Sequence, residues 1–341
     1  MTKSAVGKFK SAAVAAVALA VCAVAPAKAQ DKQITIMLWG TVWQSSFKEI
    51  SENFTKDTGI KVAVETQTSA PEGLVKLQAM RAKPSVDVWF TTLSVASRAA
   101  VDNTLFAELP LAKMDNVPQV IPGSTTKDWA AIAAFPLVML YRTDMIQQPL
   151  NSWEDLWKPA YKNKLAMPNM AMYQARMLLL SATLSGGNER NIDPGFEKLK
   201  ALKPNVAMFY SSDAQARQAL AQGEVAAVFA PPMQLRWLNE QGVPAKAAAL
   251  RPAPLEFDVA MLVKTGKEDM GAAYVNYLLR KDVNEFMAQK RNIGPVNVGA
   301  KVPDSLADIM PPAGQGLLYD ENLVNASVPA WTERFNREIA K

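Results

Sequence analysis

The sequence predicts an α/β fold that is divided into two lobes. Apolar, β-prone runs alternate with segments of helical periodicity along almost the whole chain, as in parallel βαβ units. The chain has 341 residues, and the roughly 310 that remain without an N-terminal leader exceed what one hydrophobic core usually holds. No long tract rich in Pro, Gly and Ser separates two independent halves. We therefore expect two intertwined lobes.

The N-terminus has the features of an export signal. Three lysines precede an uncharged apolar stretch over residues 11–24, and an Ala-x-Ala cleavage site follows at residues 27–29. The apolar stretch is shorter than the ~20 residues that a membrane span needs. We predict a signal peptide over residues 1–29 and a periplasmic location. A lipoprotein site at Cys22 is disfavoured, because the bulky Val21 precedes it.

The composition excludes several classes of protein. Four of the 37 basic residues lie in the leader, which contains no acid, so the remaining chain is nearly neutral against its 32 acidic residues. This balance gives no support for nucleic-acid binding. The single cysteine lies in the leader and the chain has no histidine. Disulfides, thiolate or histidine-dependent catalysis and the usual zinc ligands are thus excluded, and we expect no cofactor or metal site.

The first part of the remaining chain reads as successive βαβ units. The predicted order is strand 34–39, a helix from Ser45 or Ser46 to Thr58, strand 60–64, helix 71–82, strand 86–90 and helix 95–102. In such sheets the ligand binds beyond the carboxyl ends of the strands. Trp39 and Thr41 after the first strand, and Thr92 and Ser94 after the third, are therefore placed to line a site. The hydroxyl groups can equally cap the next helix.

The apolar run over residues 130–141 predicts the first crossing into a second lobe. The predicted order continues with a capped helix at 152–157, strand 164–167, helices 171–184 and 196–202, strand 207–210, helix 213–222 and strand 225–230. Strand 259–263, helices 271–280 and 282–289, and a last helix from residue 328 follow. We assign residues 30–135 with 257–300 to one lobe, and residues 136–256 with 301–341 to the other.

The capped helix belongs to the most informative stretch of the sequence. Ser152 is placed as its N-cap, Asp155 stands three residues on, and Pro159 cannot continue it. Trp153 and Trp157 share one face, so their indoles are predicted to pack rather than to contact a ligand. This stretch resembles the segment Ser-Trp-x-Asp-Leu-Trp-x-Pro-x-Tyr-Lys of extracellular solute-binding proteins of the spermidine/putrescine-binding type, which serve ABC importers.

The resemblance extends over nearly all of the chain that follows the leader. Its other pieces are residues 54–62, 204–207, 223–225 and 276–283, together with Asp258. It implies the two-lobed fold of type II periplasmic binding proteins, with two mixed sheets flanked by helices. It also implies a ligand cleft between the lobes that closes by hinge motion.

The resemblance further implies a set of cleft residues. Asp258 matches the acid that binds an ammonium group in the family, whereas Tyr173 stands where the family has one of a second pair of acids. Glu256 and Glu321 either replace those missing acids or are solvated surface acids. The candidate ligand-binding residues are Trp39, Thr41, Thr92, Ser94, Tyr173, Tyr210, Phe229, Glu256, Asp258 and Glu321.

Two arginines leave the charge of the ligand open. If Arg176 and Arg217 point into the cleft, they favour a carboxylate or phosphate ligand through bidentate pairing. If they lie on helix surfaces, as most arginines do, they have no such role.

These observations predict the periplasmic substrate-binding component of an ABC import system. It would capture a polyamine-like solute or another small organic ion and deliver it to an inner-membrane permease. We expect a monomer without enzymatic activity. A ferric-ion-binding protein of the same fold is an alternative, although those proteins use adjacent tyrosines, which this sequence lacks. A secreted hydrolase that uses paired carboxylates, such as Asp87, Asp258 and Glu256, is a further alternative.

Overall fold

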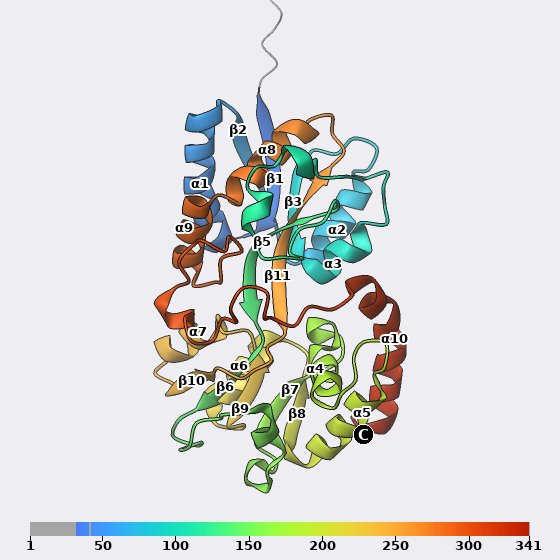
Figure 1. Ribbon diagram of the computed structural model, residues 1–341, viewed down its shortest axis with the longest axis vertical. Coiled ribbons are helices and arrows are strands. Elements are labelled where there is room, and N and C mark those ends of the chain that lie inside the picture. Colours follow the sequence, from blue (N-terminus) through green and yellow to red (C-terminus); the bar gives the residue numbers. More distant parts are fainter. Residues whose placement is uncertain (1–31, 41, 341) are drawn as a thin grey trace, which may run out of the picture. The chain divides into compact units, whose positions relative to one another are not determined.

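The computed structural model describes residues 32–40 and 42–340 (Figure 1). The predicted signal peptide, with Cys22, and the candidate site residue Thr41 lie outside these residues. Two sheets with helices packed against them confirm the α/β class. Within the described residues, every helix is too short or too polar to span a bilayer.

The first sheet is mixed. Its strand order is β2-β1-β3-β11-β4, and β5 also pairs with β11. Strand β1 runs parallel to β2 and β3, whereas β11 runs antiparallel to β3, β4 and β5. The strands are β1 (Gln33–Trp39), β2 (Lys61–Gln67), β3 (Val88–Thr92), β4 (Phe106–Ala107), β5 (Ala130–Pro136) and β11 (Leu255–Val263).

The second sheet is also mixed, with the order β10-β6-β9-β7-β8. Strand β7 pairs in parallel with β8 and β9, and β6 pairs antiparallel with β9 and β10. The strands are β6 (Val138–Arg142), β7 (Leu165–Pro168), β8 (Val206–Tyr210), β9 (Ala227–Ala230) and β10 (Ala245–Ala248). The short β4 and β10 are absent from the sequence prediction, because two to four residues carry too little periodicity.

Strands β5 and β11 connect the two sheets. Only Leu137 separates β5 from β6 of the second sheet. Strand β11 brings the chain back, and its first residue, Leu255, pairs with Pro136 at the end of β5. Figure 1 shows the two strands side by side. This arrangement positions Glu256 and Asp258 of β11 close to the point where the chain passes from one sheet to the other.

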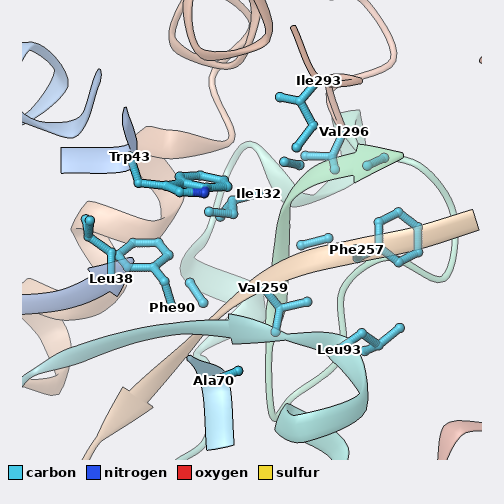
Figure 2. Close-up of a cluster of buried hydrophobic side chains, with 14 of the residues drawn as sticks. Leu38, Trp43, Ala70, Phe90, Leu93, Ile132, Phe257, Val259, Ile293 and Val296 are labelled. Atoms are coloured by element: carbon cyan, nitrogen blue, oxygen red, sulfur yellow. The ribbon is translucent and has the colours of Figure 1, made fainter. Parts of the chain in front are cut away.

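Helices cover both sheets and close two hydrophobic cores. In the first core Trp43, Leu38 and Phe90 lie near Ile132 of β5 (Figure 2). The second core contains Trp153 and the apolar face of α10. The helices are α1 (Val42–Thr58), α2 (Ala70–Ala79), α3 (Leu93–Ala99), α4 (Arg176–Leu184), α5 (Asp193–Leu202), α6 (Asp213–Gln222), α7 (Gln234–Glu240), α8 (Glu268–Leu278), α9 (Lys281–Arg291) and α10 (Glu321–Glu338).

The capped segment after Ser152 forms a 3₁₀ helix, Trp153–Trp157. The Asp155 carboxylate accepts a hydrogen bond from the Ser152 amide over 3.0 Å. Trp153 is buried in the second core and donates its indole N–H to the Pro252 carbonyl over 2.7 Å. Trp157 packs against the same core and donates its indole N–H to the Lys198 carbonyl over 2.9 Å. The prediction that the two tryptophans pack is therefore confirmed.

Several predicted helix starts were wrong. Helices α5 and α8 each begin three residues before the predicted starts at residues 196 and 271. Helix α1 begins at Val42, before the predicted serine caps. Helix α10 begins at Glu321 rather than at residue 328, because Asp320 caps it by accepting from the Leu323 amide, and the helix continues through Pro329. The predicted helix 171–184 is interrupted near its start. Tyr173, Gln174 and Ala175 have φ angles of 49°, 47° and 59°, so a regular α-helix starts only at Arg176.

Candidate ligand-binding site

Asp258 is the centre of the candidate site. It pairs across the sheet with Thr92, the last residue of β3. The Thr92 hydroxyl lies 3.3 Å from the Ser94 hydroxyl and caps no backbone amide of α3. The fold therefore gathers three of the predicted site residues at the carboxyl end of β3, where the strand rule places a ligand.

Asp258 is a largely buried residue whose carboxylate has no hydrogen-bond partner among the described residues, although its oxygens are not fully enclosed. Only 7% of the surface of Asp258 is exposed to solvent. Burial raises the pKa of Asp258 to about 7, the positive charge of Arg291 opposes this rise, and the negative charge of Glu256 adds to it. A buried carboxylate without a partner is costly, so a cationic group placed beside it would be stabilised.

Aromatic rings and Arg291 lie at the end of β1. The ring centroids of Trp39 and Trp43 are 5.4 Å apart, and the Arg291 Cζ atom lies 4.1 Å from the Trp43 ring centroid. Figure 2 shows the Trp43 indole over Ile132, at the border of the first core. Trp39 was predicted as a site residue from the sequence, whereas Trp43 and Arg291 were not. A tryptophan early in a helix and an arginine in a last helical turn are ordinary features, so the sequence carries no signal for either.

Glu256 and Glu321 both form ion pairs with Arg176. These pairs were not predicted from the sequence. The Arg176 Nε donates to Glu256 Oε1 of β11, and its Nη2 donates to Glu321 Oε1 at the start of α10. Arg176 itself starts α4 and is 1% exposed. One internal cation thus joins two acids from other elements, and neither acid is a solvated surface group.

The three charges of this cluster are strongly coupled. Burial raises the pKa of Glu256 to about 7 and also raises the pKa of Glu321, while Arg176 opposes both shifts. Burial disfavours the charged form of Arg176, but the two carboxylates outweigh it and the pKa of the guanidinium is raised. Among the described residues, the buried Arg176 Nη1 and Glu321 Oε2 have no hydrogen-bond partner. Because Arg176 already neutralises one of the two acids, the cluster offers less charge to a bound cation than two free carboxylates would.

A second polar group lies in the interrupted segment before α4. The Tyr173 hydroxyl donates to Asp213 Oδ1, at the start of α6. Burial raises the pKa of both groups. The Tyr210 hydroxyl is also close to that of Tyr173, but it donates to the Phe229 carbonyl over 2.5 Å. The sequence analysis missed Asp213, which reads as an ordinary acid in a first helical turn.

Tyr210 and Phe229 are enclosed by apolar side chains. Both residues are 0% exposed. The Phe229 ring packs on Trp153, with 5.7 Å between ring centroids. In this arrangement their side chains face core residues, so a ligand contact through them stays a prediction.

The remaining charged candidates lie apart from Asp258 or have internal partners. Asp87 directly precedes β3, at the end of the strand opposite to Thr92. Its carboxylate accepts hydrogen bonds from the Thr35 amide over 2.7 Å and the Thr265 hydroxyl over 2.5 Å. Arg217 donates to Gln234 over 2.8 Å and stacks on Trp237. Asp87 therefore does not form an acid pair with Asp258.

The family of the chain follows from a match over residues 49–309. This segment matches the family model described as bacterial extracellular solute-binding protein. The chain belongs to this family. Its members are extracellular solute-binding proteins of bacteria.

Curated relatives of this solute-binding protein carry different ligands in their names. The spermidine/putrescine-binding periplasmic protein of Salmonella typhimurium is 27% identical over 277 residues, which cover 73% of this chain and 74% of the relative. The gamma-aminobutyric acid-binding protein of Pseudomonas aeruginosa is 22% identical over 306 residues, 86% of each chain. The Fe(3+)-binding periplasmic protein of Serratia marcescens is 32% identical over 204 residues, 58% of this chain and 57% of the relative.

Solved structures confirm the two-lobed fold of periplasmic binding proteins. The spermidine/putrescine ABC transporter substrate-binding protein of Streptococcus pneumoniae superposes with a TM-score of 0.71 at 18% identity, covering 89% of this chain and 99% of that chain. At this identity the likeness establishes the fold and leaves the ligand open.

Proposed function

We propose that this solute-binding protein works in the periplasm and captures a small organic solute that carries one ammonium group, which binds at Asp258. The supporting observation is which of three acids near strands β5 and β11 already have a hydrogen-bond partner. These acids are Asp258, Glu256 and Glu321. Asp258 has no hydrogen-bond partner among the described residues, whereas Glu256 and Glu321 both bind Arg176. One unpartnered carboxylate suits one ammonium group, and a buried charge pair of this kind is favourable when it is hydrogen-bonded.

The same observation disfavours a long polyamine. A di- or polyamine has at least two ammonium groups, and each needs a carboxylate that is free to pair with it. Here Arg176 pairs with both acids that would hold the second group and neutralises one of their two charges, so the cluster offers less negative charge to a second ammonium group. The two relatives named for spermidine/putrescine and for gamma-aminobutyric acid both bind compounds with ammonium groups, so an ammonium subsite is compatible with either name.

Ferric ion is the weaker candidate. Iron bound by tyrosines requires phenolate oxygens, and Tyr173 and Tyr210 are the tyrosines that lie close together at this site. Burial raises the pKa of both phenols, which opposes formation of phenolate before a metal arrives.

The transport step would be a population shift between open and closed arrangements of the two lobes. A ligand that contacts both lobes binds the closed arrangement more tightly and therefore stabilises it. An inner-membrane permease would then recognise the closed monomer and receive the solute. The predicted lobe boundaries, which divide the chain near residues 135 and 256, are part of this proposal.

The test begins with native mass spectrometry of the purified protein, which detects any solute that co-purifies. A thermal-shift screen follows, with monoamines, polyamines, amino acids, organic acids, phosphorylated compounds and ferric ion. We expect stabilisation by compounds with an ammonium group. Stabilisation only by anions without an ammonium group, or by ferric ion, would overturn the ammonium site. Turnover of a bound compound would overturn the role as a binding protein.

Asp258→Asn tests the site itself. Loss of a charged hydrogen bond should weaken binding of the stabilising amine by about 1.5 to 3 kcal/mol. Asp308→Asn is the matched control, because Asp308 is exposed and lies outside the candidate site. Equal affinities for wild type and Asp258→Asn would remove Asp258 from the site.

A further inference from the structure

Arg291 is held in place by the backbone on both sides. It is the last residue of α9, and Asn292 ends the helix in the left-handed conformation at a φ of 52°. The next residue, Ile293, is buried in the first core, and Gly294 pairs with Ala134 of β5. The position of the guanidinium is therefore set by the first core rather than by a mobile surface loop.

The Arg291 guanidinium has no hydrogen bond or ion pair among the described residues. Its Nε is buried without a partner, and its contact is the face of Trp43 at 4.1 Å. Trp43 in turn packs between Trp39 and Phe47, with centroid distances of 5.4 and 5.7 Å. An aromatic face stabilises a guanidinium but satisfies none of its five N–H donors.

Two other arginines, the fully buried Arg176 and the partly buried Arg217, show what is missing. Arg176 donates to two carboxylates, and Arg217, which also stacks on a tryptophan, donates to Gln234. Burial lowers the pKa of Arg291 to about 10, while Asp258 opposes this shift, so the guanidinium stays charged at neutral pH. A charged, partly buried guanidinium without an acceptor is costly, and an anionic group would remove that cost.

Asp258 pairs with Ala133 of β5, and the next residue, Ala134, pairs with Gly294, which follows Arg291 by three residues, so Arg291 and Asp258 lie near each other without forming an ion pair. Each lacks a hydrogen-bond partner within the described residues. Two opposite charges that are held apart in this way, one on α9 and one on β11, match a molecule that carries both a cation and an anion.

We infer that Arg291 binds the anionic group of the solute, so that the ligand is a small zwitterion whose carboxylate meets Arg291 and whose ammonium group meets Asp258. This inference rests on the proposed ammonium site and adds a binding group for the carboxylate of the ligand. The planar guanidinium offers two parallel N–H donors to one carboxylate, and the Trp43 stack keeps that plane fixed. A simple amine would leave Arg291 without a partner, and a simple acid would leave Asp258 without one.

The experiment compares matched ligands on the ligand-free protein by isothermal titration calorimetry. The probes are ω-amino acids from glycine to aminohexanoate, the monoamine of each chain length and the carboxylic acid of each chain length. For the wild type, the best amino acid should bind about 10 to 100 times more tightly than the matching amine, as expected for one charged hydrogen-bond pair.

Arg291→Gln should abolish this preference, so that the amino acid and the matching monoamine bind the variant with affinities within about twofold of each other. Arg291→Lys keeps the charge without the planar fork and should show an intermediate preference, which keeps the test valid if Arg291→Gln folds poorly. Arg217→Gln is the control, since Arg217 also stacks on a tryptophan but has its own acceptor, and it should retain the full preference.

The outcomes separate the two proposals. If amines and amino acids bind the wild type equally, or if Arg291→Gln retains the preference, the role of Arg291 is overturned while the ammonium site stands. If carboxylic acids bind as tightly as amino acids, or if neither amines nor amino acids bind, the ammonium site at Asp258 fails and the zwitterion fails with it.

Discussion

Asn325 of α10 donates its side-chain amide to the Ser97 hydroxyl of α3 over 2.9 Å. The same amide reaches the Ser94 carbonyl over 3.2 Å. Helix α10 packs its Trp331 and Phe335 into the second core, whereas α3 belongs to the first. This contact therefore ties the two cores together next to the candidate site.

Asn325→Ala should lower the free energy of unfolding by about 1 kcal/mol, the usual contribution of a hydrogen bond between neutral groups. Urea denaturation of wild type, Asn325→Ala, Ser97→Ala and the double variant measures the coupling between the two side chains. Additive effects of the two single substitutions would mean that the contact does not stabilise the fold.

Arg176→Met should destabilise the protein by about 3 to 5 kcal/mol at pH 8, because it leaves Glu256 and Glu321 buried without a cation. Burial raises the pKa of both acids, so the loss should be smaller at pH 5, where protonation removes their charge. Urea denaturation at the two pH values checks this. The exposed Arg190, which pairs with Asp320 at 3.2 Å, provides the control Arg190→Met with an expected effect below about 0.5 kcal/mol.

Changing both acids together with Arg176 distinguishes a charge effect from lost packing. The triple variant Arg176→Met, Glu256→Gln, Glu321→Gln should recover much of the stability that Arg176→Met loses. If the triple variant is as unstable as Arg176→Met alone, the buried charges are not the cause.

The pH dependence of stability should carry a contribution from Asp258. Its folded pKa of about 7 lies above its ordinary value of 3.8, so the folded state keeps a proton that the unfolded state has lost. This contribution is fully present below pH 4 and is lost as the pH rises to about 7, at roughly 1.4 kcal/mol per pH unit within that window. Urea denaturation across pH 4 to 8 should show a flatter curve for Asp258→Asn than for wild type; parallel curves would contradict the raised pKa.

Binding of an ammonium solute should show the opposite trend with pH. The ligand pairs with ionised Asp258, so its affinity should rise about tenfold per pH unit as the pH approaches 7 and then level off. Calorimetric titration from pH 5 to 8 measures this dependence. An affinity that does not change between pH 5 and 8 would indicate that the ligand binds elsewhere.

The interrupted segment before α4 offers a test of backbone strain. Ala175 has a φ of 59°, where an L-residue with a Cβ is disfavoured by roughly 1 kcal/mol, so Ala175→Gly should stabilise the protein by up to about 1 kcal/mol. Ala182 lies in α4 with equal burial but regular helical geometry, and Ala182→Gly should destabilise by about 1 kcal/mol. Thermal or urea unfolding of the pair gives the difference, and equal effects of the two substitutions would argue against strain at Ala175.

Much of the fold could be predicted from local sequence. Helix α6 spans Asp213–Gln222 as predicted, because its signals are local: Ser212 accepts from the Gln215 amide, and Gly223 adopts a φ of 76°. Strand β1 and the packing of Trp153 were likewise accessible from apolar periodicity. The strand rule selected Thr92 and the family resemblance selected Asp258, and these two residues pair directly across the sheet.

The tertiary structure alone decided which charges meet. Arg176 lies 80 residues from Glu256 and 145 residues from Glu321, so no local pattern could pair them. Whether a buried acid is free to bind a ligand or already pairs with an internal cation depends on which helices and strands pack around it. The sequence by itself determined most of the helices and strands, because caps, turns and periodicity act over a few residues. The pairing of buried charges acts through space, and only the tertiary structure shows that Asp258 and Arg291 have no hydrogen-bond partner in the described part of the chain.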